Sequence, residues 1–147
     1  MNRLRSRAWL VLFGLGVIVA MFSAGAAFMG IDARDFEQST GIAWSQFSAS
    51  EPDVATYLAR LERLIGVGYA VTGLLWAAIA FRSLRQGQRD AWYFLWTMPA
   101  VFGGASAIFL SHGSPGLGMY YGVFAILAII GLAGSYPLAV AMEPSPG

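Results

Sequence analysis

The chain has 147 residues, of which 57% are hydrophobic and only 12% are charged, and its net charge is +1. Soluble domains carry about 25% charged residues, so this composition excludes an ordinary soluble protein. Cysteine is absent, which excludes disulfide bridges, thiolate metal sites and cysteine nucleophiles. All nine basic residues are arginine, which we interpret as a hint of a bacterial, GC-rich genome.

Four stretches of the chain contain no charged side chain, and they comprise residues 8–28, 64–81, 91–110 and 117–136. A helix of about 20 residues rises about 30 Å, which is the thickness of the hydrocarbon layer of a bilayer. In lipid, only a helix satisfies its own backbone hydrogen bonds within such a segment. The sequence therefore predicts an all-α integral membrane four-helix bundle, folded as a single domain over residues 1–147.

The first stretch has two interpretations. Arg3, Arg5 and Arg7, the apolar run and Ala24-Gly25-Ala26 follow the pattern of a signal peptide with its cleavage site. The apolar run is long for a signal peptide, however. We therefore expect a retained helix, with cleavage as the alternative.

Residues 29–63 form an outer segment between the first two spans, and this segment is long for an unstructured loop. Ile42, Trp44 and Phe47, set among polar residues, predict a short helix on the outer membrane surface. Aromatic residues of this kind usually anchor a protein at the interface, and a recognition surface is the alternative.

A long second helix is expected from Glu51 to Phe81. Ser50 and Asp53 fit a capping box around Pro52, which is tolerated in a first helical turn. A helix of that length measures about 46 Å, so its first turns are expected to extend beyond the membrane or to bend.

Pro99 interrupts the third span, because proline removes one backbone donor and crowds the carbonyl of Leu95. We therefore expect a kinked helix there. Gly134 and Pro137 are expected to limit the fourth span.

Two arginine clusters indicate the orientation of the chain. They are Arg3, Arg5 and Arg7 before the first span, and Arg82, Arg85 and Arg89 between the second and third. Because arginine is enriched in cytoplasmic loops, both termini are expected in the cytoplasm, with the protein in the bacterial inner (plasma) membrane. Six aromatic residues are expected to anchor the chain at the two interfaces: Trp9, Trp92, Tyr93, Trp96, Trp44 and Phe47.

Small residues predict where helices pack closely. Gly118 and Gly122 form a G-x-x-x-G pair in the fourth span, and Gly66 lies in the second. Such residues allow two backbones to approach each other. Packing inside the bundle is the main interpretation, and a homodimer contact is the alternative.

The strongest candidate site is Arg60, Glu62 and Arg63, near the start of the second span. Arg60 and Arg63 are three residues apart and share a helix face, from which two guanidinium groups can bind a lipid phosphate or a carboxylate. The alternative is that both arginines extend to the headgroups while Glu62 moderates their charge.

Catalysis, metals and cofactors have no candidate residues. His112 is the single histidine, and one imidazole without a nearby carboxylate does not build a zinc site. The charge-free stretches carry no ionisable group of the kind that active transporters keep inside the membrane. No catalytic residue, metal ion or cofactor is therefore expected, and nucleic acid is not expected as a partner.

A pattern between residues 52 and 99 is shared with a known group. It comprises Pro52, Arg60, Leu64-Ile65-Gly66, Gly73, Arg82, Gly87, Trp92-Tyr93, Trp96 and Pro99. It resembles small four-span bacterial membrane proteins of unknown function, akin to the DoxX-like group. The resemblance covers about a third of the chain and rests on glycines and aromatic residues. It implies a four-helix membrane bundle and an association with redox or stress complexes, and it carries over no catalytic residue.

Three functional hypotheses follow. The first is a non-enzymatic accessory or scaffold subunit of a membrane assembly, with membrane lipids and either protein subunits or a second copy as partners. The second is a protein that binds lipid or a hydrophobic small molecule beside Arg60 and Arg63. The third is a redox or quinone-associated membrane subunit.

Overall fold

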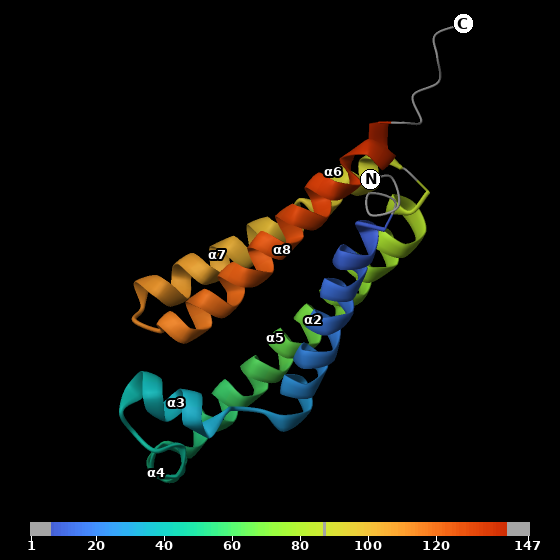
Figure 1. The fold of residues 1–147 in the computed structure, drawn as a ribbon. Coiled ribbons are helices and arrows are strands. Elements are labelled where there is room, and N and C mark those ends of the chain that lie inside the picture. The colour runs from blue at the N-terminus through green and yellow to red at the C-terminus, as the bar shows by residue number, and fades with distance from the viewer. Residues whose placement is uncertain (1–6, 87, 141–147) are drawn as a thin grey trace, which may run out of the picture. The chain divides into compact units, whose positions relative to one another are not determined.

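The computed structural model describes residues 7–86 and 88–140, and the side chains of this part as far as Tyr136. Within the described residues every regular element is a helix (Figure 1). Four helical segments are long and apolar enough to cross a membrane: Trp9–Met29, Pro52–Leu84, Arg89–Ser111 and Pro115–Tyr136. The predicted all-α fold with four membrane helices is confirmed. These four helices are those expected of a multi-pass membrane protein.

Two compact units make up the chain. One comprises Ile18–Thr72, and the other comprises Met1–Val17 together with Gly73–Gly147. The boundaries between the units fall inside α2 (Trp9–Met29) and inside α5 (Pro52–Ile79). Each unit therefore contains one part of α2 and one part of α5.

In the unit Ile18–Thr72, the last turns of α2 lie against α5 at Gly66. A Cβ atom on Gly66 would lie 2.9 Å from the backbone nitrogen of Ala27 and 3.0 Å from the carbonyl oxygen of Ser23. The chain then leaves α2 through Gly30, whose φ of 76° lies in the left-handed region that favours glycine. Glycine is therefore required at both positions, for close packing at Gly66 and for the turn at Gly30.

Two short helices connect α2 to α5 (Figure 1). The first, α3 (Ala33–Thr40), is capped by Asp32, whose carboxylate accepts hydrogen bonds from the backbone N–H groups of Arg34 at 2.9 Å and Asp35 at 3.4 Å. The second, α4 (Trp44–Ser50), confirms the short helix predicted from the aromatic residues. No pattern in the sequence predicted α3.

The N-terminal cap predicted for the second long helix is wrong. Ser50 is the last residue of α4, and its hydroxyl donates to the carbonyl oxygen of Phe47 at 3.0 Å. The carbonyl oxygen of Glu51 accepts the first helical bond, from the N–H of Ala55 at 2.9 Å, and α5 begins at Pro52. Ser50 cannot cap α5 because it already ends the preceding helix, only two residues away. The length is close to the prediction, since α5 has 28 residues and is followed by a π-helical turn, η1 (Ala80–Leu84).

The other unit contains parts of all four long segments. They are the start of α2, the end of α5 with η1, the pair α6 (Arg89–Leu95) and α7 (Thr97–Ser111), and α8 (Pro115–Val140). Its largest fully buried side chains are Leu12, Leu84, Leu95, Met98, Leu132 and Ser135. These residues come from each of the four segments, so the unit has one shared core.

Small residues bring α2 close to two helices of this core. A Cβ atom on Gly16 would lie 2.7 Å from the backbone nitrogen of Ala77 on α5. A Cβ atom on Gly131 of α8 would lie 2.9 Å from side-chain atoms of Leu12. Gly131 was not among the glycines predicted to lie at a helix contact.

The interruption predicted near Pro99 lies at Trp96, between α6 and α7. Pro99 has no N–H to donate to the carbonyl of Leu95, where α6 ends. At the break itself, the N–H of Trp96 donates to the carbonyl oxygen of Tyr93, three residues back, at 3.2 Å. At the other end of the chain, α8 continues to Val140, three residues past the proline that was expected to limit it.

Candidate functional site

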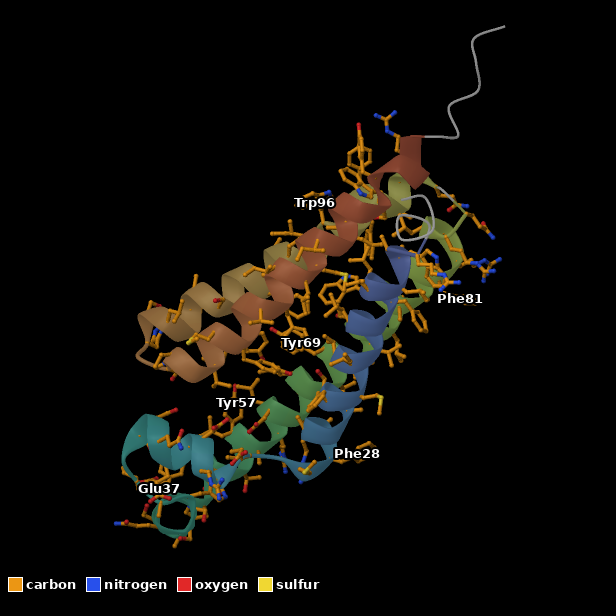
Figure 2. The ribbon with its side chains drawn as sticks, in the orientation of Figure 1. Phe28, Glu37, Tyr57, Tyr69, Phe81 and Trp96 are labelled. Carbon is orange, nitrogen blue, oxygen red and sulfur yellow. The ribbon has the colours of Figure 1, made fainter. Side chains whose placement is uncertain are left out.

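An open groove lies between α3 and α5, entirely within the unit Ile18–Thr72, and its volume is about 350 Å³. Figure 2 shows the side chains of this region, with Glu37 of α3 and Tyr57 of α5 labelled. The groove is lined by Ile31, Asp32, Asp35, Phe36, Ser39, Leu58, Leu61, Glu62 and Ile65. We refer to it as the α3–α5 groove.

Helix periodicity explains how α5 contributes to the groove. Leu58, Leu61, Glu62 and Ile65 have the spacing i, i+3, i+4 and i+7, which places them on one face of a helix. Three of these four side chains are apolar, and the fourth is a carboxylate. The groove wall on α5 is therefore a hydrophobic stripe with one negative charge in it.

The wall on the side of α3 repeats this mixture. Asp32 precedes the helix, and Asp35, Phe36 and Ser39 lie within it at positions three, four and seven residues later. The ring of Phe36 packs on Trp44 at 4.9 Å and on Phe47 at 5.1 Å, measured between ring centroids. Because α4 supplies these two rings, it supports the α3 wall from outside the groove.

Negative charge dominates the electrostatics of the groove. Its lining includes three carboxylates, of Asp32, Asp35 and Glu62, and no arginine. Glu62 is partly buried and lies within range of the charges of the two aspartates. Within the described part of the chain, the carboxylates of Asp35 and Glu62 accept no hydrogen bond and form no ion pair. Three like charges therefore share one partly apolar site.

The structure separates the three residues of the predicted anion site. Glu62 lines the α3–α5 groove, whereas Arg60 and Arg63 do not. The side chain of Arg63 lies beside Gly30, with Nε and one terminal nitrogen each 3.9 Å from the place that a Cβ atom on Gly30 would occupy. Gly30 follows the last turn of α2, where the partial negative charge of the helix end favours a cation. Arg63 therefore lies beside the turn that follows α2, and both Arg60 and Arg63 are exposed.

The interfacial aromatic residues predicted near the arginine loop form two clusters. Trp9 packs edge-on against Phe13 and Phe81. The guanidinium of Arg85 lies 5.7 Å from the centroid of the Trp9 ring. A cation at this distance from an aromatic face is attracted by the ring. Arg85 therefore lies against the aromatic rings found where α2 begins and where α5 ends.

The second cluster is centred on Trp92, whose ring contacts those of Tyr93, Trp96 and Tyr136. The indole N–H of Trp92 donates to the carbonyl oxygen of Leu132 at 2.9 Å, so this side chain joins α6 to α8. Tyr93 and Trp96 are exposed, as residues at a membrane interface would be. On the other unit, Trp44 and Phe47 are partly buried in the ring cluster around Phe36.

The predicted packing glycines lie at contacts between helices. A Cβ atom on Gly118 would lie 2.5 Å from Cγ of Leu110, and one on Gly122 would lie 3.3 Å from the hydroxyl of Ser106. That hydroxyl donates to the carbonyl oxygen of Gly118 at 2.7 Å, which ties α7 to α8. Gly66 provides the approach of α5 to α2 described above.

His112 lies at the end of α7, where it is exposed. Its Nδ1 is 2.9 Å from the carbonyl oxygen of Ile108 and 3.1 Å from the hydroxyl of Ser111. In the part of the chain that the structure describes, no three histidine, aspartate or glutamate side chains are grouped closely enough to hold a metal ion.

Comparison of the chain with models of protein families, with curated proteins and with solved structures gave no match.

Proposed function

We propose that this is a non-enzymatic membrane protein that binds a lipid or another hydrophobic small molecule in the α3–α5 groove. The observation that carries this proposal is the composition of the groove wall, where five large apolar side chains surround three carboxylates. Binding sites for small molecules are typically concave, mostly apolar and provided with a few polar groups that fix the orientation of the ligand. The groove has each of these properties.

The size of the groove limits the ligand. Pockets for drug-sized molecules have volumes of about 300–1,000 Å³. A volume of about 350 Å³ lies at the low end of that range. The groove therefore suits a small amphiphile or one end of a longer lipid, with the remainder of the molecule outside it.

Polar groups elsewhere in the membrane helices already hold the fold together. The indole of Trp76 donates to the hydroxyl of Thr97 at 3.0 Å, and the hydroxyl of Ser135 donates to the carbonyl oxygen of Leu132 at 3.0 Å. The hydroxyl of Thr72 donates to its own helix, to the carbonyl oxygen of Gly68 at 2.8 Å. These groups serve packing, whereas in the α3–α5 groove polar and apolar side chains meet around an open space.

Filling the groove is expected to remove the bound molecule. We expect the variant Ser39→Trp to retain at least about tenfold less co-purifying small molecule than the wild type, because the indole would occupy the space that the ligand needs. Native mass spectrometry of protein purified in mild detergent measures this retention.

The matched control is Gln38→Trp, which adds the same side chain at the neighbouring position of α3, outside the groove lining. This variant should retain the ligand at the wild-type level. If wild type, Ser39→Trp and Gln38→Trp all retain the same molecules in the same amounts, the groove is not the binding site.

A second candidate function is that of an accessory subunit in a membrane assembly. One observation favours it: Ala100, Gly104 and Ala107 are all exposed, and their spacing places them on one face of α7. Small residues at such spacing allow a further membrane helix to approach closely. In the native mass spectra described above, this role predicts a protein partner or a second copy that stays bound to the Ser39→Trp variant.

For the membrane and the orientation, we propose the bacterial inner membrane with both termini in the cytoplasm. The arginine clusters before the first span and between the second and third spans support this orientation. We expect an impermeant thiol reagent to label Gln46→Cys on intact cells and to leave Gln86→Cys unlabelled. Both positions are exposed in the folded chain, so burial does not confound the comparison. Labelling of Gln86→Cys alone would reverse the orientation.

A further inference from the structure

We propose that the ligand of the α3–α5 groove carries a positive charge: an organic ammonium group attached to a short hydrocarbon. This inference rests on the proposed function, and it adds the chemical class of the ligand. Two sources can provide such a group, namely the headgroup of an aminophospholipid and a free alkylamine.

The charges of the groove support a cationic ligand. Asp32 and Asp35 line it from the side of α3, and Glu62 lines it from α5, so negative charge faces the space from both elements. No arginine lines the groove to balance these charges. Like charges brought together in a partly apolar site repel one another, and a bound cation removes that repulsion. An anionic ligand would increase it.

The apolar part of the wall indicates what surrounds the charge. Leu58, Leu61 and Ile65 form a continuous face of α5 that can cover hydrocarbon. Phe36 adds an aromatic ring, and organic ammonium groups are attracted to the faces of such rings. An alkylammonium ion matches both parts of the wall, since it combines a cation with a hydrocarbon chain.

A bare metal ion matches the groove less well. A metal site needs several ligand atoms at one point, and the described residues include no group of three acidic or histidine side chains arranged for that purpose. Asp32 also uses its carboxylate to cap α3, where two backbone N–H groups bind it. The carboxylates are thus spread along the groove, which suits a bulky cation held by charge and by hydrophobic contact.

The test uses n-hexyltrimethylammonium as the probe and the full chain in a nonionic detergent. Isothermal titration calorimetry would compare this probe with hexanol and with hexyl sulfate, which have the same hydrocarbon but are neutral or negative. The Ser39→Trp variant serves as the blank for partition into micelles. We expect the wild type to bind the ammonium probe at least about tenfold more tightly than hexanol, and hexyl sulfate more weakly than either.

Two variants that each neutralise one carboxylate test whether the preference for the cationic probe arises in the groove. Glu62→Gln and Asp35→Asn remove one charge each while keeping the shape of the side chain, so both should lose most of the preference for the cation. Glu37→Gln and Asp53→Asn are the matched controls, because both remove an exposed carboxylate from the same unit outside the groove lining. The controls should bind the probe as the wild type does.

The outcomes separate this inference from the proposed function. If hexanol and the ammonium probe bind the wild type equally, and Ser39→Trp abolishes both, the groove binds hydrocarbon and the cationic ligand is overturned. Loss of binding in the controls to the same extent as in Glu62→Gln also overturns it. If no probe binds the wild type above the Ser39→Trp blank, both the inference and the proposed function fail.

The source of the ammonium group follows from the same titration in lipid nanodiscs. One preparation contains phosphatidylglycerol alone, and the other contains phosphatidylethanolamine as well. If an aminophospholipid headgroup is the occupant, it competes with the probe, and binding weakens only in the second preparation. Equal affinity in both preparations indicates a free alkylamine.

Discussion

Replacing Gly16 with alanine is expected to destabilise the protein by about 1–3 kcal/mol, although alanine normally favours a helix. The added Cβ atom would lie 2.7 Å from the backbone nitrogen of Ala77 and 2.8 Å from the carbonyl oxygen of Gly73. Backbone atoms of a packed helix cannot rotate away as a side chain can. Helices α2 and α5 must therefore separate to accept one methyl group. Unfolding in mixed micelles, followed by intrinsic fluorescence, measures the free energy of unfolding.

The control lies two residues earlier on the same helix. A Cβ atom on Gly14 would meet nothing within 4 Å. Gly14→Ala should therefore leave the free energy of unfolding unchanged, or raise it by about 0.5–1 kcal/mol through the better helix propensity of alanine. Equal stability of the two variants would show that α2 and α5 do not touch at Gly16.

Truncation of Trp76 is expected to have the largest effect of any single substitution proposed for this protein. Its side chain is 2% exposed, contacts the ring of Phe102 and donates its indole N–H to Thr97. Trp76→Ala removes the ring and leaves a cavity, which typically costs about 3–5 kcal/mol. Trp76→Phe keeps most of the volume and should lose only about 1 kcal/mol, largely from the missing hydrogen bond.

Leu75→Ala is the control for this comparison, since it truncates the adjacent side chain of α5, which is 53% exposed. It should change the free energy of unfolding by less than about 0.5 kcal/mol. A double-mutant cycle of Trp76→Phe with Thr97→Val isolates the hydrogen bond. If Trp76→Ala is no less stable than Leu75→Ala, the core arrangement around Trp76 is wrong.

Hydrophobicity made the membrane helices predictable. A charge-free stretch of about 20 residues has few alternatives to a membrane helix, because the backbone must satisfy its hydrogen bonds internally. The break near Pro99 was predictable for a similar reason, since proline cannot donate its missing bond whatever surrounds it. Both features depend on local chemistry, which a sequence contains.

The α3–α5 groove was not predictable in the same way. Asp32, Asp35 and Phe36 have no distinctive pattern of their own, and their meaning depends on α3 packing beside α5. One signal was available: Glu62 falls in the helical stripe of Leu58, Leu61 and Ile65, where a carboxylate is out of place unless it serves a site. We associated Glu62 with its neighbours in sequence, Arg60 and Arg63, although a helix turns them away from the stripe.

The cap of α5 shows the limit of a local motif. Ser50, Pro52 and Asp53 satisfy the pattern of a helix start, but the pattern does not exclude a preceding helix that ends at the same serine. Gly131 shows the same limit for packing, since a close approach depends on what lies opposite.

The ring cluster of Phe36, Trp44 and Phe47 has a spectroscopic consequence. The chain has five tryptophans, and Trp44 is the one within Ile18–Thr72. Its ring centroid lies 4.9 Å from that of Phe36, which lines the α3–α5 groove. With 5-fluorotryptophan incorporated, the ¹⁹F resonance assigned by Trp44→Phe would report on the groove from a site just behind its wall. The resonances of the four other tryptophans, which lie in the unit of Met1–Val17 and Gly73–Gly147, would serve as an internal reference in the same spectrum.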